Sequence, residues 1–174
     1  MTDAVDHRRL PLTERHEIAK HGPTLILDGS CGLCSTSAAK LFQYSPTPAP
    51  FYVMWGQHAD TLPLLKEYGI SQEDIMASWA VVENGNITRG ADAWLRAASL
   101  LRYPYCLVTP LGRLVPKFIR DVAYDFVARN RQTISTSRVF VYLFGGKGDK
   151  VICRRPTKAM MGRYLHDTTD LPKS

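Results

Sequence analysis

Two cysteines three positions apart, Cys31 and Cys34, are the residues of this sequence best suited to chemistry. They follow the short, mainly apolar run Thr24-Leu-Ile-Leu-Asp28 and Gly29, and so stand where a strand would end and a helix begin. Unpaired N–H groups at a helix N-terminus stabilise a thiolate, and the three-residue offset brings both sulfurs to one helix face within bonding distance. The spacing predicts a redox pair in which an exposed Cys31 attacks and Cys34 resolves the mixed disulfide.

Asp28 stands at the predicted end of the strand, three residues before Cys31. Pointing inward beneath the cysteines, its carboxylate would be poorly solvated and could accept the proton of Cys34 when that thiol attacks. Asp-Gly-Ser is also ordinary turn chemistry, so a purely structural role for Asp28 stays open. An unpaired buried carboxylate is costly, so in the catalytic case an asparagine at position 28 is expected to keep or raise stability.

A metal site is the other common use of a Cys-x-x-Cys pair. A tetrahedral site needs further ligands, and the sequence offers no second Cys-x-x-Cys and no His-x-x-x-His. Cys106 and Cys153 are isolated, and the five histidines show no ligand-like pairing. The sequence therefore predicts neither a metal nor a cofactor. A metal shared between the cysteine pairs of two chains is the weaker alternative.

The composition is that of one ordinary globular domain. The chain has 174 residues, of which 45% are hydrophobic and 22% charged, which excludes a wholly disordered protein. No apolar run approaches the roughly 18 residues of a membrane span. The first 22 residues contain no apolar core of about 7–15 residues, so no secretory signal is expected and the predicted location is the cytoplasm.

The predicted elements follow the order β-α-β-α-β-β-α, with Asn84-Gly85 as the hairpin turn. Strands are expected over 24–28, 51–55, 79–83 and 86–89, and helices over 30–44, 62–68, 93–101 and 118–130. Ser30 is the expected N-cap of the first helix. This order predicts an α/β fold with a mixed sheet. A Cys-x-x-Cys at its first strand–helix junction is typical of thioredoxin-like redox domains.

Three segments make up the predicted domain organisation: a polar N-terminal arm (1–23), a thioredoxin-like domain (24–131) and a basic extension packed on it (132–174). In the extension, strands are expected over 139–144 and 150–153 as a hairpin, and a helical turn over 160–166. From residue 129 onward ten Lys and Arg stand against three Asp and Glu, while the whole chain carries +6. These charges are scattered among apolar residues, so a solvated basic face is favoured over a nucleic-acid or membrane site.

The motif Asp28-x-x-Cys31-x-x-Cys34 resembles the signature of the DCC family of thiol-disulfide oxidoreductases. The similarity continues with Gly85, the run Arg89-Gly-Ala-Asp-Ala93 and the stretch from Tyr124 to Arg131, and covers about residues 24–131. The resemblance implies a thioredoxin-like domain whose two cysteines form the redox pair. Thioredoxins and glutaredoxins usually place a cis-proline before the third strand. Here the corresponding residues 76–79 contain no proline, so substrate docking must differ.

Other polar and aromatic residues have a structural and a functional interpretation. Trp55 and Trp79 could line a substrate groove, although strand aromatics are more often core. Asp92 could orient a ligand carboxylate through nearby N–H groups, but a helix N-cap is the simpler role. Asn130 and Arg131 could be functional, and are expected to tie the last helix to the body.

The sequence thus predicts intracellular thiol–disulfide exchange on a protein or small-molecule disulfide, with glutathione among the candidates. It gives no firm signal for a nucleic acid or a membrane. The alternative from another class is a non-catalytic thioredoxin-like binding module. Such a module would use the basic C-terminal segment to hold a protein, a nucleic acid or an anionic surface.

Overall fold

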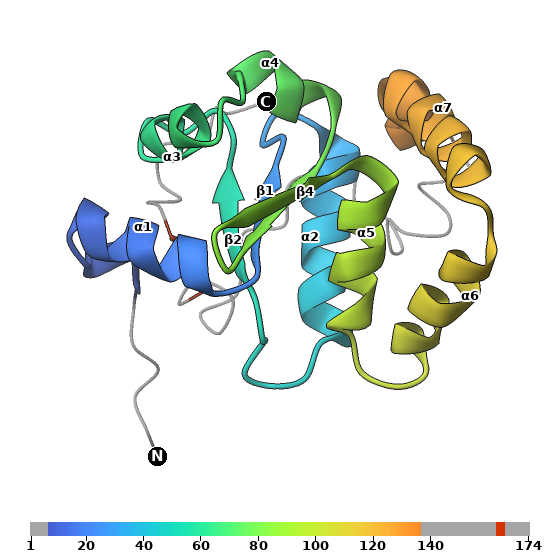
Figure 1. Ribbon diagram of the computed structural model, residues 1–174, viewed down its shortest axis with the longest axis horizontal. Coiled ribbons are helices and arrows are strands. Elements are labelled where there is room, and N and C mark those ends of the chain that lie inside the picture. Colours follow the sequence, from blue (N-terminus) through green and yellow to red (C-terminus); the bar gives the residue numbers. More distant parts are fainter. Residues whose placement is uncertain (1–6, 137–162, 166–174) are drawn as a thin grey trace.

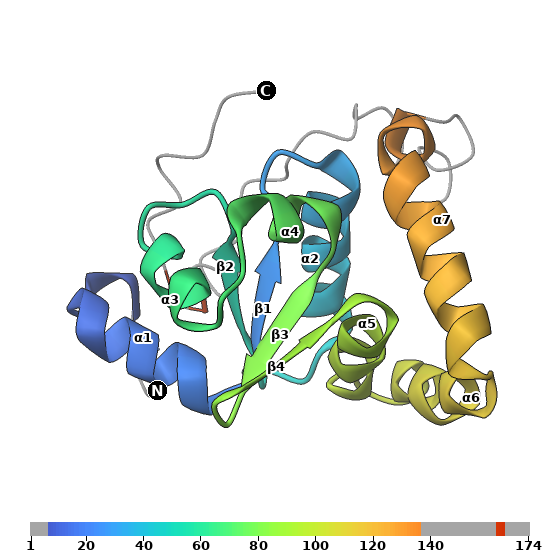
Figure 2. The ribbon, with the colours of Figure 1, turned by 45° about the horizontal axis from the view of Figure 1, so that its top comes forward.

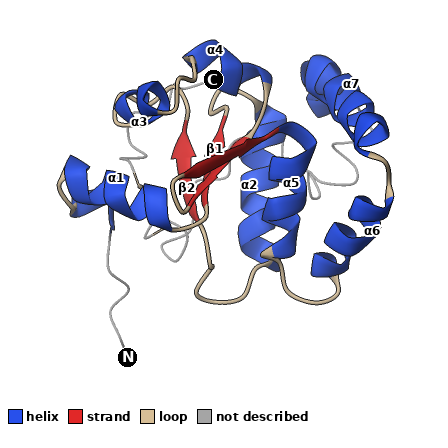
Figure 3. Ribbon diagram, viewed as in Figure 1, coloured by secondary structure: helices blue, strands red, loops and turns tan. Residues whose placement is uncertain are grey.

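The computed structural model describes residues 7–136 and 163–165, in which a four-stranded sheet lies between two layers of helices (Figures 1 and 3). The elements in chain order are η1 His7–Arg9, α1 Leu12–His21, β1 Thr24–Leu27, α2 Gly32–Tyr44, β2 Tyr52–Trp55, α3 Leu62–Glu67, α4 Gln72–Ala77, β3 Ala80–Glu83, β4 Asn86–Arg89, α5 Gly90–Ser99, η2 Tyr105–Leu107, α6 Val108–Leu114 and α7 Lys117–Thr136. Every strand and helix of the predicted β-α-β-α-β-β-α order is present.

The sheet is mixed, with the strand order β2-β1-β3-β4. β1 and β2 are parallel, as their connection through α2 requires, whereas β3 is antiparallel to both β1 and β4. The β3–β4 turn is formed by Asn84 and Gly85, both at positive φ (49° and 72°), which is the backbone of a tight hairpin. This topology confirms the predicted thioredoxin-like α/β fold.

Alternation along the strands divides the core between the two faces of the sheet. Leu25 and Leu27 of β1 face the layer that contains α2 and α5. Ile26, between them, faces the layer formed by α1, α3 and α4. All three side chains are fully buried, so β1 is the central strand of both cores.

Three helices lie where the sequence predicted none. α1 occupies most of the predicted polar arm and buries Ala19 against the sheet. α4 begins with a capping box in which the Ser71 hydroxyl accepts the Asp74 N–H and the Asp74 carboxylate accepts the Ser71 N–H. α6 contains Pro110. Pro110 stands in the first helical turn, where a missing N–H removes no helical hydrogen bond.

α6 and α7 lie on the outer side of α5 (Figure 2). Arg120 of α7 pairs with Asp92 at 2.8 Å, and Lys117 reaches the same carboxylate at 3.2 Å. The predicted N-cap role of Asp92 is therefore wrong: α5 begins at Gly90 with Arg89 as its N-cap, and Asp92 ties α7 to α5. In the part of the chain that the structure describes, no helix combines the length and apolar character needed to cross a membrane.

Residues 163–165 return to the edge of the sheet. The Val53 N–H donates to the Arg163 carbonyl at 3.0 Å, and the Leu165 N–H donates to the Val53 carbonyl at 3.2 Å, so Tyr164 forms a parallel bridge to β2. Tyr164 and Leu165 are buried. For these three residues the predicted helical turn is wrong. The strands predicted over 139–144 and 150–153 lie outside the described residues.

Candidate active site

The two cysteines of the motif occupy the start of α2, as the sequence predicted. Cys31 is the N-cap residue in extended conformation (φ −96°, ψ 118°), and Cys34 lies in the first turn of the helix. Ser30, the expected N-cap, instead donates its hydroxyl and its N–H to the Asp28 carboxylate. The backbone N–H groups of Leu33 and Cys34, at the start of the helix, lower the pKa of Cys31.

A hydrogen bond between the two thiol groups sets their ionisation. A hydrogen bond from the Cys34 thiol lowers the pKa of Cys31 to about 6, and the backbone N–H groups and the charge of Arg131 act in the same direction. The same hydrogen bond raises the pKa of Cys34 far above its usual range, and burial and the negative charges of Cys31 and Asp28 add to this. At neutral pH, Cys31 is therefore largely a thiolate and Cys34 a thiol.

Cys31 is less accessible than the sequence predicted. Cys31 is 7% exposed and Cys34 2%, so the expectation of an exposed Cys31 is wrong. The cause is packing: both cysteines belong to the apolar cluster beneath α2, together with Trp79 and Tyr164. Neither cysteine is in a disulfide. A substrate disulfide must approach closely against this cluster to reach Cys31.

Asp28 lies buried beside the motif, and its carboxylate is fully engaged. One oxygen accepts the Ser30 N–H at 2.9 Å, the Ser30 hydroxyl at 2.6 Å and the Gln57 amide. The other oxygen pairs with Arg131 of α7 at 3.0 Å. The carboxylate is thus buried as expected but not unpaired, which reverses the expected effect of an asparagine on stability.

The structure connects Asp28 to Cys34 through charge. Cys34 Sγ accepts the Trp79 indole N–H at 3.3 Å, and no hydrogen bond joins Cys34 to Asp28 among the described contacts. After the hydrogen bond with Cys31 and burial, the carboxylate charge helps to raise the pKa of Cys34. Arg131, on the other side of the ion pair, favours the Cys31 thiolate. The Asp28–Arg131 pair thus separates the charge states of the two sulfurs.

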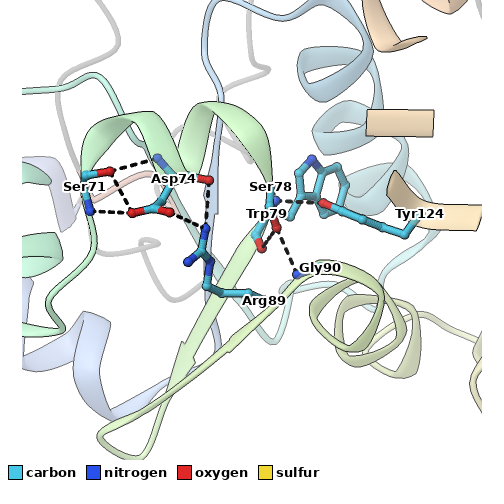
Figure 4. Close-up of polar contacts among 7 residues, drawn as sticks. All are labelled: Ser71, Asp74, Ser78, Trp79, Arg89, Gly90 and Tyr124. Carbon is cyan, nitrogen blue, oxygen red and sulfur yellow. Dashed lines mark hydrogen bonds and ion pairs between the residues drawn. The ribbon is translucent and has the colours of Figure 1, made fainter. Parts of the chain in front are cut away.

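Trp79 is a core residue, as favoured from the sequence, but it also contacts the redox pair. Its backbone N–H donates to the Tyr124 hydroxyl at 2.8 Å, while the neighbouring Ser78 hydroxyl accepts the Gly90 N–H at 3.1 Å (Figure 4). Burial raises the pKa of Tyr124, so this hydroxyl stays protonated. Residues 76–79, which lack the proline of thioredoxins, are therefore held in place by α5 and by Tyr124 of α7. The indole of Trp79 contacts Cys34.

Some site residues could not be assigned from the sequence. Gln57 carries no motif signal at all. Tyr124 stands in a stretch that resembles the DCC family, and this was its only signal. Arg131 supplies the predicted tie to the body, whereas Asn130 donates to the Phe126 carbonyl of its own helix. Within residues 7–136 and 163–165, no group of three or more His, Cys, Asp and Glu side chains is placed to hold a metal ion.

A dithiol with one ionised and one protonated sulfur, at the start of the first crossover helix of a thioredoxin-like sheet, defines a thiol–disulfide oxidoreductase. The model of the DCC1-like thiol-disulfide oxidoreductase family matches residues 25–137, and the chain belongs to this family. It is also similar to the uncharacterized protein YuxK of Bacillus subtilis (strain 168), with 28% identity over 141 residues, which are 81% of this chain and 92% of the relative. No solved structure matches the chain. Membership of the family implies a disulfide-bearing substrate.

Proposed function

We propose that the protein reduces disulfides with Cys31 as nucleophile and Cys34 as resolving residue. The Cys31 thiolate attacks one substrate sulfur, forms a mixed disulfide and releases the other half of the substrate as a thiolate. Cys34 then loses its proton and attacks the Cys31 sulfur, which releases the second half and leaves a Cys31–Cys34 disulfide. Two electrons pass to the substrate, and an external thiol returns them. The observation that carries the proposal is the position of the two cysteines at the start of α2, with Cys31 as the N-cap residue and Cys34 in the first turn, where the pKa of Cys31 is lowered to about 6.

Asp28 is proposed to assist the second step as proton acceptor for Cys34. The negative charge of Asp28 contributes to the raised pKa of Cys34 and so disfavours the Cys34 thiolate. If the carboxylate takes up the proton of Cys34, this repulsion disappears as the thiolate forms. The complete burial of Asp28 beside the cysteine motif supports the proposal.

The proposed substrate is a protein or a small-molecule disulfide, and the proposed location is the cytoplasm. Glutathione disulfide is one candidate substrate. The exchange reaction is tested by mixing the reduced protein with a candidate disulfide. The expected result is that the protein passes through an intramolecular disulfide.

Alkylation of Cys31 by iodoacetamide is expected to depend on pH with a midpoint near pH 6. Below this pH the thiolate is protonated and the rate falls; above it the rate reaches a plateau, since the thiol is already ionised. Peptide mass spectrometry after timed labelling measures the rate for each cysteine. In Cys34→Ala, which lacks the hydrogen-bond donor, the midpoint should move upward. Equal labelling of all cysteines, with rates that rise beyond about pH 8, would favour the non-catalytic binding module.

Cys106 and Cys153 are expected to be dispensable for exchange. Cys106 is partly exposed and lies apart from the motif, and neither residue has a cysteine neighbour three positions away. The double replacement by alanine should keep disulfide-reductase activity within about twofold of the parent, measured alongside a urea melt. Loss of activity in a folded double variant would mean that more than two cysteines relay electrons.

A further inference from the structure

A cavity of about 470 Å³ opens beside Cys34, between α2, α5 and α7. Cys34 contributes to its wall, whereas Cys31 does not. Leu33, Trp79, Trp94 and Val127 supply large apolar surfaces around it. Its volume is that of a typical small-ligand site, and one wall is a redox-active sulfur of the proposed reaction.

Short side chains create this space where the helices cross. Ser37 of α2, Ala91 of α5 and Ala128 of α7 all line the cavity, and none is long enough to fill it. Gly112 of α6 also lines the cavity next to Leu95; a Cβ atom at this glycine would lie 2.5 Å from a Leu95 methyl carbon. The cavity wall is formed mainly by α2, α5 and α7, and α4, α6 and the Ser78–Trp79 segment complete it.

The charges around the cavity are already neutralised. Arg120 and Arg131 both line it, but Arg120 pairs with Asp92 and Arg131 with Asp28. Within the described part of the chain, the wall thus presents no cation without a carboxylate partner. A ligand carboxylate, such as the two of each glutathione, would have to compete with these ion pairs, whereas an apolar group is favoured by burial alone.

We propose that this cavity binds an apolar side chain next to the substrate disulfide, aromatic or branched aliphatic, so that the protein prefers apolar peptide disulfides to glutathione disulfide. This inference rests on the proposed exchange at Cys31. Leu33 and Cys34 belong to the same helical turn as Cys31, and Arg131, whose charge acts on Cys31, lines the cavity. A group a few bonds from a sulfur joined to Cys31 therefore lies next to this space.

Two matched substrates test the preference: the symmetrical disulfides of acetyl-Cys-Phe-amide and acetyl-Cys-Ser-amide. Both release thiols of similar pKa, so a difference in kcat/KM reports the neighbouring side chain. We expect kcat/KM to be at least about tenfold higher for the phenylalanine peptide, since full burial of such a side chain is worth about 10- to 100-fold. Glutathione disulfide should react no faster than the serine peptide.

Two substitutions on α7 locate the preference. Ala128→Leu projects a larger side chain into the cavity and is expected to reduce the Phe/Ser ratio to about one. Val122→Leu is the control, because Val122 is on the same helix, 69% exposed and outside the cavity wall. It should retain the full ratio. Where Ala128→Leu does not fold, Ser37→Leu fills the same space from α2.

The possible results separate the two proposals. Equal kcat/KM for both peptides overturns the inference and leaves the exchange function standing, and so does a preference that Ala128→Leu does not change. Absence of exchange with every disulfide overturns the proposed function. In that case the affinity of the reduced peptides for Cys31→Ser, measured by calorimetry, decides the inference alone: tenfold tighter binding of the phenylalanine peptide supports it, and equal binding overturns it.

Discussion

Replacing Cys31 with serine is expected to abolish disulfide reduction, whereas replacing Cys34 with serine is expected to trap the substrate on Cys31. The serine hydroxyl at position 31 is not ionised at neutral pH, so turnover should fall by on the order of 10³-fold or more. In Cys34→Ser the first attack still takes place, because Cys31 keeps the backbone N–H groups and Arg131 that favour its thiolate. Only the resolving sulfur is missing.

Intact-mass spectrometry of each variant after mixing with the disulfide distinguishes the two steps. Cys34→Ser should gain the mass of half the substrate and lose it on addition of a reductant, while Cys31→Ser should gain none. Cys106→Ser is the control, because it removes a free and more exposed cysteine without touching the motif. A trapped adduct on Cys34 in the Cys31→Ser variant would reverse the proposed roles.

Replacing Asp28 with asparagine is expected to lower the free energy of unfolding by about 3 kcal/mol, because removal of one partner of a buried ion pair leaves the other charge uncompensated. Arg131 would lose its carboxylate and face a neutral amide. Urea melts of the reduced protein measure this effect. Asp92→Asn is the matched control: it also removes the partner of an α7 arginine, but its carboxylate is 37% exposed, so its loss should cost about 1 kcal/mol or less.

The same variant tests the proposed chemistry of Asp28. Formation of the mixed disulfide should change little, whereas its resolution by Cys34 should slow by about 10²-fold, the usual contribution of a general base. Stopped-flow measurement separates the two steps. Unchanged resolution in a destabilised Asp28→Asn protein would leave Asp28 a partner of Arg131 and nothing more. Adding Arg131→Gln should make the protein no less stable than Asp28→Asn alone, because the unpaired charge is then gone.

The elements that depend on a local sequence pattern could be predicted from the sequence. The apolar run of β1, the small-residue helix α2 and the Asn84-Gly85 hairpin each carry their own signal within a few residues. The position of the cysteine pair at the strand–helix junction follows from these elements. The short helices α4 and α6 were not predicted, because a capping box and a proline in the first turn read equally well as loop chemistry.

The contacts that complete the site were not predictable from local pattern. The ion pair from Asp28 to Arg131 and the hydrogen bond from Trp79 to Cys34 join residues far apart in the chain. They depend on how α7 and the residue before β3 pack against the junction of β1 and α2. Burial of Cys31 likewise depends on the assembled apolar cluster. The sequence could therefore locate the sulfurs but not the groups that control their ionisation.

The bridge between Val53 and Tyr164 also affects whether two molecules of the protein can pair through their β2 strands. β2 is an edge strand, and the free N–H and C=O groups of an edge can pair with a strand of another molecule. Residues 163–165 already occupy both backbone groups of Val53, and the Tyr164 ring packs against the rings of Trp55 and Phe42. At this edge the chain thus blocks intermolecular strand addition with its own backbone, which protects the folded protein against aggregation along β2.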